Sequence, residues 1–207
     1  MFLVKPTKSG EGNTKAVKYG TVEYQELILE RTILVNKVLH LGFNILLCDI
    51  DAVWLKNPMP YISRGYDIQA QPEADGRLCG GFIFLMSSPG VQDLWQKVTD
   101  AHKEVVKTAE KVHHLRGVDE SEQQLLLKLL PKANLKVKKL DSDMFPHGLK
   151  YFGPQMTYHS KMDLNKIHPA VVHNNYVIGK DKKILRFKHF GLWYIGDKSQ
   201  DYKCKLE

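Results

Sequence analysis

The chain has 207 residues, of which 43% are hydrophobic, and this composition is typical of a globular protein and excludes a disordered or fibrous one. Its longest apolar runs, such as residues 81–86, are far below the roughly 18 residues of a spanning helix, so no membrane segment, secretion signal or anchor is predicted within this chain. The net charge is +7, but the basic residues are spread among acidic ones rather than gathered in one dense stripe, which argues against nucleic acid as a partner.

The chain begins with a predicted tail, a helix and a strand. Residues 1–18 are polar, rich in Gly and Lys and without periodicity, and we interpret them as a disordered or loop tail before a single domain at residues 19–207. Apolar residues recur at helical spacing from Val22, and Gly42 is a natural helix end. The apolar run 44–49 ends in an acid and predicts a central parallel strand that is covered on both faces.

Strands and helices alternate beyond a turn at Asn57-Pro58. Ser88 as N-cap and Pro89 as first helical residue open a long amphipathic helix, and a second helix is predicted at residues 121–130, before Pro131. Short strands are predicted at residues 67–71, 82–86, 135–140 and 170–174. This alternation indicates an α/β fold with a mostly parallel sheet flanked by helices.

The most informative motif is Asp49-Ile50-Asp51, at the end of the first predicted strand. Alternate residues of an extended chain face the same way, so the two carboxylates lie on one side. Ligands of open α/β sheets bind at the carboxyl ends of strands, and two carboxylates there suit Mg²⁺ or Mn²⁺ bound to a substrate's phosphates. The spacing alone fits equally well two acids that end a strand and cap the next turn.

Two enzyme classes place Asp-x-Asp after an apolar strand. In phosphatases of the haloacid dehalogenase type, Asp49 would be the nucleophile, and residues 196–201 imitate the second acidic motif of that class. The long helix before the strand and the few residues after Asp201 argue against this class. In glycosyltransferases with a GT-A fold, the acidic pair holds a divalent ion.

Four segments in the same order resemble the nucleotide-diphospho-sugar transferase domain of the glycosyltransferase family 77 type, which includes plant xylosyl- and arabinosyltransferases. They are residues 45–62, 79–88, 145–148 and 173–193, within a resemblance that covers roughly residues 19–195. The resemblance implies a GT-A-like, Rossmann-like fold, a UDP-sugar donor and a Mn²⁺ or Mg²⁺ cofactor. It also implies a glycan or glycoprotein acceptor, retention of the anomeric configuration and residence in the Golgi lumen.

The resemblance also suggests which residues hold the metal. Asp49 and Asp51 match the acidic pair, with Asp51 the more direct ligand, and His173 matches the histidine that completes the metal site. Neutral imidazole is a reasonable ligand for Mn²⁺ and a poor one for Mg²⁺, which prefers oxygen. From the residue type alone, His173 would be read as a hydrogen-bonded, half-buried histidine.

Further residues match donor-binding elements of the family. Gly179 and Lys180 resemble a Gly-Lys element near the donor diphosphate, where a lysine acts as a point charge. Gly80 and Gly81 would let the backbone approach the sugar closely, because they lack a Cβ atom. An exposed helix face explains three later basic residues equally well, namely Lys183, Arg186 and Lys188.

The proposed catalytic positions depart from the family pattern. Glu122 and Gln123 are the nearest match to an Asp-Gln pair that opens a helix near the reacting sugar carbon. An acidic helix N-terminus that complements the helix dipole explains Glu122 equally well. Cys79 stands where the family more often has Asn or Asp, which changes the hydrogen bonds expected there.

The position of Asp49 in the chain is a further departure. Only 48 residues precede it, so we expect part of the N-terminal nucleotide-binding half, and any anchor with it, to be missing from this chain. The expected activity is metal-dependent, retaining transfer of a xylose, galactose or arabinose type of sugar from a UDP-sugar to an acceptor hydroxyl. The alternatives are a Mg²⁺-dependent phosphohydrolase with Asp49 as nucleophile and a catalytically inactive remnant of a transferase.

Overall fold

The computed structural model describes residues 21–112, 120–154, 162–163 and 166–195, so the predicted tail and the acidic segment 196–201 lie outside the described residues. Its helices are α1 (Val22–His40), α2 (Pro89–Val112), α3 (Glu122–Leu129), α4 (Gly148–Phe152) and α5 (Lys180–His189), with short 3-10 helices at η1 (Met59–Tyr61) and η2 (Leu130–Lys132). The strands are β1 (Ile45–Cys48), β2 (Ala52–Trp54), β3 (Ile68–Pro72), β4 (Leu78–Leu85), β5 (Val137–Lys139) and β6 (Val171–His173).

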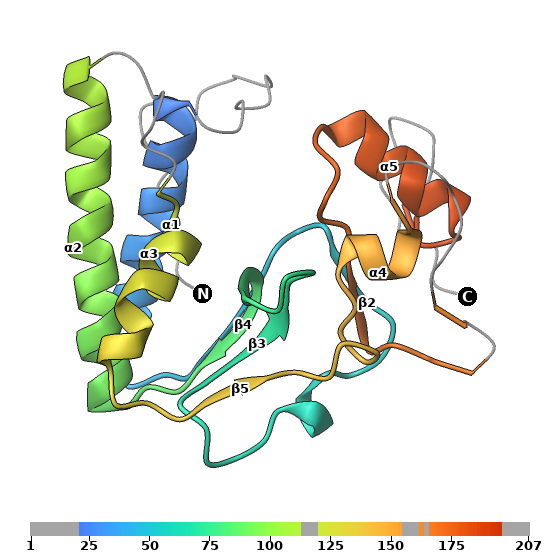
Figure 1. Ribbon diagram of the computed structural model, residues 1–207, viewed down its shortest axis with the longest axis horizontal. Coiled ribbons are helices and arrows are strands. Elements are labelled where there is room, and N and C mark those ends of the chain that lie inside the picture. The colour runs from blue at the N-terminus through green and yellow to red at the C-terminus, as the bar shows by residue number, and fades with distance from the viewer. Residues whose placement is uncertain (1–20, 113–119, 155–161, 164–165, 196–207) are drawn as a thin grey trace.

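The elements form two groups around a central sheet. Figure 1 shows α1, α2 and α3 together on one side, the four-stranded sheet in the middle, and α4 and α5 on the other side, next to β2. The α/β architecture expected from the sequence is therefore confirmed and agrees with a GT-A-like fold. None of the helices in the described part of the chain is long and apolar enough to cross a membrane.

The sheet is mixed, and the prediction that it is mostly parallel is wrong. Its order is β1-β4-β3-β5, with antiparallel pairs β1–β4 and β3–β4 and one parallel pair, β3–β5. β1 therefore lies at the end of the described sheet rather than at its centre. Its continuous apolar sequence still has a physical reason: Ile45 and Leu47 pack against the core under the helices, while Leu46 and Cys48 pack against the cluster around Phe82.

The helices predicted from Val22 and from Pro89 are confirmed. Gly42 follows the end of α1 with a φ of +87°, a conformation that favours glycine. α2 begins at Pro89, and the Ser88 hydroxyl accepts a hydrogen bond from the backbone N–H of Val91. The amphipathic pattern predicted for this helix is confirmed, because one face of α2 is buried or packs against the core, at Leu94, Trp95, Val98, Ala101, Val105, Val106 and Ala109.

A polar group lies within the helical layer, at the contact between α1 and α2. His102 is fully buried, with Nδ1 3.1 Å from Thr32 Oγ1 and Nε2 3.0 Å from Gln25 Oε1. Burial, and next the positive charge of Arg31, lower the pKa of His102 from 6.5 to about 4. The folded protein therefore holds this histidine neutral well below the pH at which an unfolded chain would protonate it.

This histidine predicts how stability changes with pH. Because the unfolded state binds its proton first as the pH falls from 6.5 to about 4, the free energy of unfolding should fall across that range, by about 3 kcal/mol from this group. Urea unfolding of the wild type and of His102→Gln measures this contribution, since glutamine keeps hydrogen-bonding atoms but does not titrate. The same pH dependence in both proteins would contradict the assignment.

A short antiparallel pair, β2–β6, connects two distant parts of the chain. Ala52 pairs with His173, and the backbone N–H of Asn174 donates to the carbonyl oxygen of Asp51 at 2.9 Å. β2 follows the Asp49-Ile50-Asp51 motif directly, whereas β6 comes more than a hundred residues later. This pairing places the acidic motif next to His173.

Candidate active site

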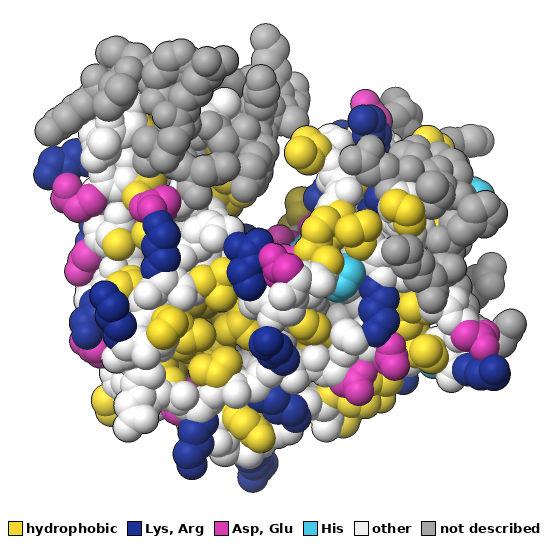
Figure 2. All heavy atoms as spheres, viewed as in Figure 1, with side chains coloured by type: hydrophobic (Ala, Val, Ile, Leu, Met, Phe, Trp, Pro, Cys, Tyr) yellow, Lys and Arg dark blue, Asp and Glu magenta, His cyan; other side chains and the backbone are white. Residues whose placement is uncertain are grey.

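A cavity of about 410 Å³ lies where β1, β4, β6 and the start of α3 meet. It opens in the hollow between the helical group and the part of the molecule that carries α5 (Figure 2). Its lining is mostly polar and includes Asp49, Asp51, Glu73, Glu122, Arg31, Arg77, Lys183 and His173. The cavity thus collects side chains of both charges from segments that are far apart in the sequence.

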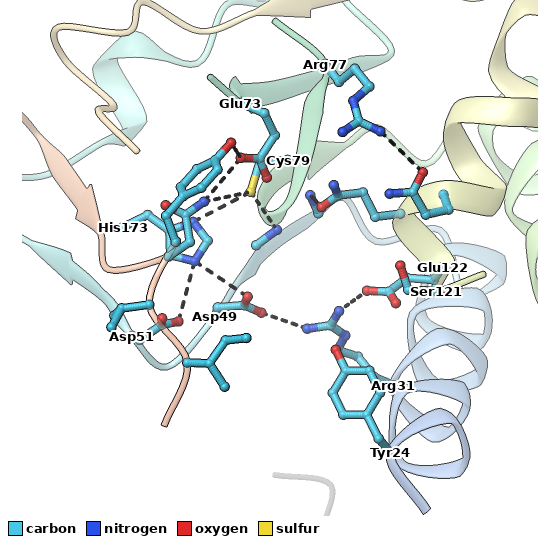
Figure 3. A pocket seen from close by; sticks show the side chains of 18 of the residues that line it. Tyr24, Arg31, Asp49, Asp51, Glu73, Arg77, Cys79, Ser121, Glu122 and His173 are labelled. Atoms are coloured by element: carbon cyan, nitrogen blue, oxygen red, sulfur yellow. Dashed lines mark hydrogen bonds and ion pairs between the residues drawn. The ribbon is translucent and has the colours of Figure 1, made fainter. Parts of the chain in front are cut away.

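The three residues predicted to hold a metal come together on one wall of this cavity. One ligand atom from each of Asp49, Asp51 and His173 lies within 4.8 Å of the others. His173 Nε2 is 3.7 Å from Asp49 Oδ2 and 3.5 Å from Asp51 Oδ1 (Figure 3). Two carboxylate oxygens and an imidazole nitrogen form a donor set that fits Mn²⁺ better than Mg²⁺.

Gly81 provides the space that these side chains occupy. A Cβ atom on Gly81 would lie 2.3 Å from His173 Cε1 and 2.6 Å from Asp49 Oδ2, closer than any real contact. The carbonyl oxygen of Gly81 also accepts a hydrogen bond of 2.8 Å from the backbone N–H of Asp49. The residue types present therefore fit a divalent ion, and the lack of a side chain at Gly81 is part of that fit.

Each carboxylate of the pair contacts a different cation. Arg31, on α1, donates to Asp49 Oδ1 at 2.7 Å and also to Glu122, so one guanidinium bridges the acidic motif and α3. Lys183, on α5, donates to Asp51 Oδ2. The sequence analysis did not identify Arg31. In the sequence, Arg31 is only a basic residue beside the apolar face of a predicted helix.

Asp51 is strongly held in its ionised form. Its side chain is 13% exposed, and this burial disfavours the charge, but the contacts of the carboxylate with His173 and with the Lys183 ammonium outweigh it. The net result is a pKa well below the ordinary value. Asp51 is therefore a carboxylate at neutral pH, which is the form that a metal ligand needs.

The two residues proposed as catalytic also lie on the cavity wall. Glu122 opens α3 and is only 3% exposed, and its carboxylate is the second partner of Arg31. Gln123 accepts a hydrogen bond of 2.7 Å from the backbone N–H of Gly80 through Oε1. A Cβ atom on Gly80 would meet the Gln123 side chain at 3.3 Å. The space beside Gly80, like the space beside Gly81, is therefore occupied by side chains of the protein itself.

The lysines near the start of α5 differ in their positions. Gly179 is the N-cap of this helix, with a φ of +101°, and Lys180 is the exposed first helical residue. Lys183 lines the cavity, whereas Lys180 is not among the described residues that line it. Arg186 is 1% exposed and donates to Asn174 Oδ1 and to the backbone carbonyl of Asn175, whereas Lys188 is exposed.

The loop between β6 and α5 is fixed to the turn after β3. The Tyr176 hydroxyl donates to Glu73 Oε2 at 2.6 Å and accepts from the backbone N–H of Ala74 at 3.0 Å. Burial, and next the hydrogen bond to Glu73, raise the pKa of Tyr176 to about 12. Tyr176 adopts a φ of 60°, which is uncommon for a residue other than glycine, and no sequence motif indicated this contact.

The chain is similar to several known glycosyltransferases. A galactosyltransferase of Dictyostelium discoideum, UDP-galactose:fucoside alpha-3-galactosyltransferase, is 26% identical over an alignment that covers 100% of this chain and 34% of that protein. Two proteins of Arabidopsis thaliana are also similar to this chain. UDP-D-xylose:L-fucose alpha-1,3-D-xylosyltransferase 3 is 27% identical over 88% of this chain and 51% of that protein. Beta-arabinofuranosyltransferase RAY1 is 29% identical over 84% of this chain and 35% of that protein.

The alignments cover only part of each relative. The chain spans about a third to a half of their length: 34% of the galactosyltransferase, 51% of the xylosyltransferase and 35% of the arabinofuranosyltransferase. Among solved structures, the glycosyltransferase GlyE of Streptococcus pneumoniae TIGR4 is 13% identical with a TM-score of 0.45, over 75% of this chain and 42% of that one. The profile of the nucleotide-diphospho-sugar transferase family matches residues 2–187, which include Asp49, Asp51 and His173. The chain therefore belongs to the nucleotide-diphospho-sugar transferase family.

Proposed function

We propose that this chain carries the donor-binding and metal-binding site of a retaining glycosyltransferase that uses a UDP-sugar of the xylose, galactose or arabinose type. The acceptor is a hydroxyl group of a glycan or glycoprotein, and the compartment is the Golgi lumen. The observation that carries the proposal is that Asp49, Asp51 and His173 meet on the wall of one cavity. The relatives named for transfer of galactose, xylose and arabinofuranose support the donor class.

The charges around the cavity suit a diphosphate leaving group. Mn²⁺ or Mg²⁺ held by Asp49, Asp51 and His173 would act as a Lewis acid toward the diphosphate. In the reaction, the bond between the anomeric carbon and the diphosphate oxygen breaks, and a bond to the acceptor oxygen forms. The acceptor hydroxyl loses its proton to a diphosphate oxygen or to an enzyme base. Front-face attack and a covalent enzyme intermediate would both retain the anomeric configuration.

The chain's own residues have separate roles in this proposal. Lys183 places a positive charge beside Asp51, where negative charge develops on the leaving diphosphate. Glu122 and Gln123 also line the cavity and are the side chains that we place next to the reacting carbon. Arg31 holds Glu122 and Asp49 at a fixed separation through its two ion pairs.

The alternatives make different predictions for ligand binding. Calorimetric titration of the full chain with UDP should give binding that requires Mn²⁺. Hydrolysis of simple phosphomonoesters would instead favour the phosphohydrolase, although the family match to residues 2–187 argues against that class. If UDP does not bind with either Mn²⁺ or Mg²⁺, the inactive remnant becomes the better explanation.

A comparison of two lysines on α5 tests where the diphosphate lies. Lys183→Ala should weaken Mn²⁺-dependent UDP binding about 10-fold, because it removes a charge-assisted contact inside the cavity. Lys180→Ala should change the affinity less than about twofold, since Lys180 is exposed and its charge is screened by solvent. Equal losses in both variants, or a larger loss for Lys180→Ala, would contradict this placement of the diphosphate.

A further inference from the structure

A buried glutamine behind the acidic motif has an amide group whose orientation is fixed by the fold. Gln71, on β3, has 0% exposure, and its Nε2 donates to the backbone carbonyl oxygen of Phe145 at 3.0 Å. The reversed amide would place its oxygen against that carbonyl oxygen, so that two acceptors would face each other in a buried site. The Oε1 atom of Gln71 must therefore point the other way, toward β6.

On that side, Gln71 Oε1 lies 2.9 Å from His173 Nδ1. Since an amide oxygen only accepts, a hydrogen bond at this distance requires the hydrogen to be on Nδ1. Cys79 Sγ also approaches Nδ1, but at 3.6 Å it is a longer and weaker contact. If the Cys79 thiol donated to Nδ1 instead, Gln71 Oε1 would face a nitrogen lone pair at 2.9 Å, which is unfavourable.

The opposite ring nitrogen then has the orientation that a metal ligand requires. With the hydrogen on Nδ1, the lone pair of neutral His173 is on Nε2, the atom that faces Asp49 Oδ2 and Asp51 Oδ1 at 3.7 and 3.5 Å. His173 is 3% exposed, so packing also limits rotation of the ring. We propose that Gln71 is a positioning residue, which fixes the ring and the Nδ1 hydrogen of His173 so that Nε2 completes the metal site. This inference rests on the metal site of the proposed function.

Figure 3 shows His173 between two groups with different roles. On one side its ring faces Asp49 and Asp51, and on the other it approaches Cys79. A hydrogen bond to the ring nitrogen that does not bind the metal, such as the one from Nδ1 to Gln71, orients a metal-bound histidine. Loss of such a hydrogen bond typically lowers metal affinity about 10- to 100-fold. Gln71 is not among the residues that line the cavity, so its effect on the metal position passes through His173.

The same strand contains a matched control. Gln69 lies two residues before Gln71, is also 0% exposed, and uses both ends of its amide. Its Oε1 accepts from the backbone N–H of Ser63 and its Nε2 donates to the carbonyl oxygen of Ser63, each at 2.8 Å. Gln69 therefore stabilises a loop rather than the metal site. Replacing Gln69 should lower the stability of the fold about as much as replacing Gln71, but it removes no contact with His173.

The first test is made on the wild-type protein. The full chain is labelled with ¹⁵N-histidine, the signals of His173 are assigned by their loss in His173→Asn, and the nitrogen shifts are measured from about pH 6 to about pH 9 with and without Mg²⁺. We expect Nδ1 to have the shift of a protonated nitrogen throughout, because this atom carries a hydrogen whether or not Nε2 does. A non-protonated Nδ1 would overturn the proposal.

The second test measures Mn²⁺ affinity by electron paramagnetic resonance. Gln71→Met, similar in length but without an acceptor, should bind Mn²⁺ about 10- to 100-fold more weakly than the wild type. Gln69→Met should stay within about twofold, even where both variants lose thermal stability. Equal losses in the two variants, or wild-type affinity in Gln71→Met, would overturn the positioning role. If the wild type binds no Mn²⁺, the proposed function itself fails, and the Nδ1 measurement still decides the geometry.

Discussion

Replacement of Asp51 by Asn is expected to lower the affinity for Mn²⁺ about 100-fold or more and to abolish Mn²⁺-dependent turnover of a UDP-sugar. Asp51 is the most buried carboxylate of the metal group, with 13% exposure, and its lowered pKa keeps it charged. Asparagine has the same shape but no negative charge. The backbone hydrogen bond from Asn174 to Asp51 does not depend on the side chain, so the β2–β6 pair should remain intact.

The control for this variant is a carboxylate outside the cavity. Asp93, on α2, is exposed and forms an ion pair of 2.7 Å with Lys97. Asp93→Asn should leave Mn²⁺ affinity and turnover unchanged, because such surface pairs contribute little. Calorimetry gives the affinity, and thermal unfolding without metal shows whether each variant is folded. Wild-type affinity and turnover in Asp51→Asn would remove Asp51 from the site.

Asp49, Asp51 and His173 could be predicted as a candidate metal site because they belong to motifs. Asp-x-Asp after an apolar run and a histidine in a matching later segment predicted the residues, but not how they meet. They meet through β2, a strand of three residues, Ala52–Trp54, which is too short to show periodicity. The antiparallel pair of β2 and β6 is a tertiary contact, and such contacts are set by packing rather than by local sequence.

The supporting residues around the metal group could not be predicted in this way. Lys180 and Lys183 lie on one helix, and sequence does not determine which of them faces the cavity until the packing of α5 is known. Gln71 belongs to an alternating segment, a pattern typical of a strand with one solvated face. In the structure both faces of β3 are covered, and Gln69 and Gln71 are buried.

The direction of the strands could not be predicted from the sequence pattern either. The apolar run before Asp49 correctly indicated a strand covered on both faces, and the helices packed on one side and Phe82 on the other provide this cover. Burial of both faces is common in parallel sheets, which led to the wrong prediction for β1. Hydrophobicity reports how much a strand is covered, but the partner strand and its direction depend on the whole fold.

Gly81→Ala tests the geometry of the site without removing any ligand. The φ of Gly81 is outside the range that favours glycine, so the effect of alanine comes from space rather than from backbone conformation. Its Cβ atom would overlap His173 Cε1 at 2.3 Å and Asp49 Oδ2 at 2.6 Å, and both side chains would have to move. We expect a loss of about 1–3 kcal/mol in the free energy of unfolding and a decrease in Mn²⁺ affinity of more than about 10-fold.

The neighbouring glycine separates these two effects. The nearest atoms to a Cβ on Gly80 would be Cβ and Oε1 of Gln123, each at 3.3 Å, and they include no atom of Asp49 or His173. Gly80→Ala should therefore keep Mn²⁺ affinity within about twofold, as measured by calorimetry alongside urea unfolding. If Gly81→Ala also bound Mn²⁺ like the wild type, Asp49 and His173 would not need to hold their observed positions together. The metal would then have to be bound by a different set of atoms, because these two side chains cannot both stay in place beside a methyl group at Gly81.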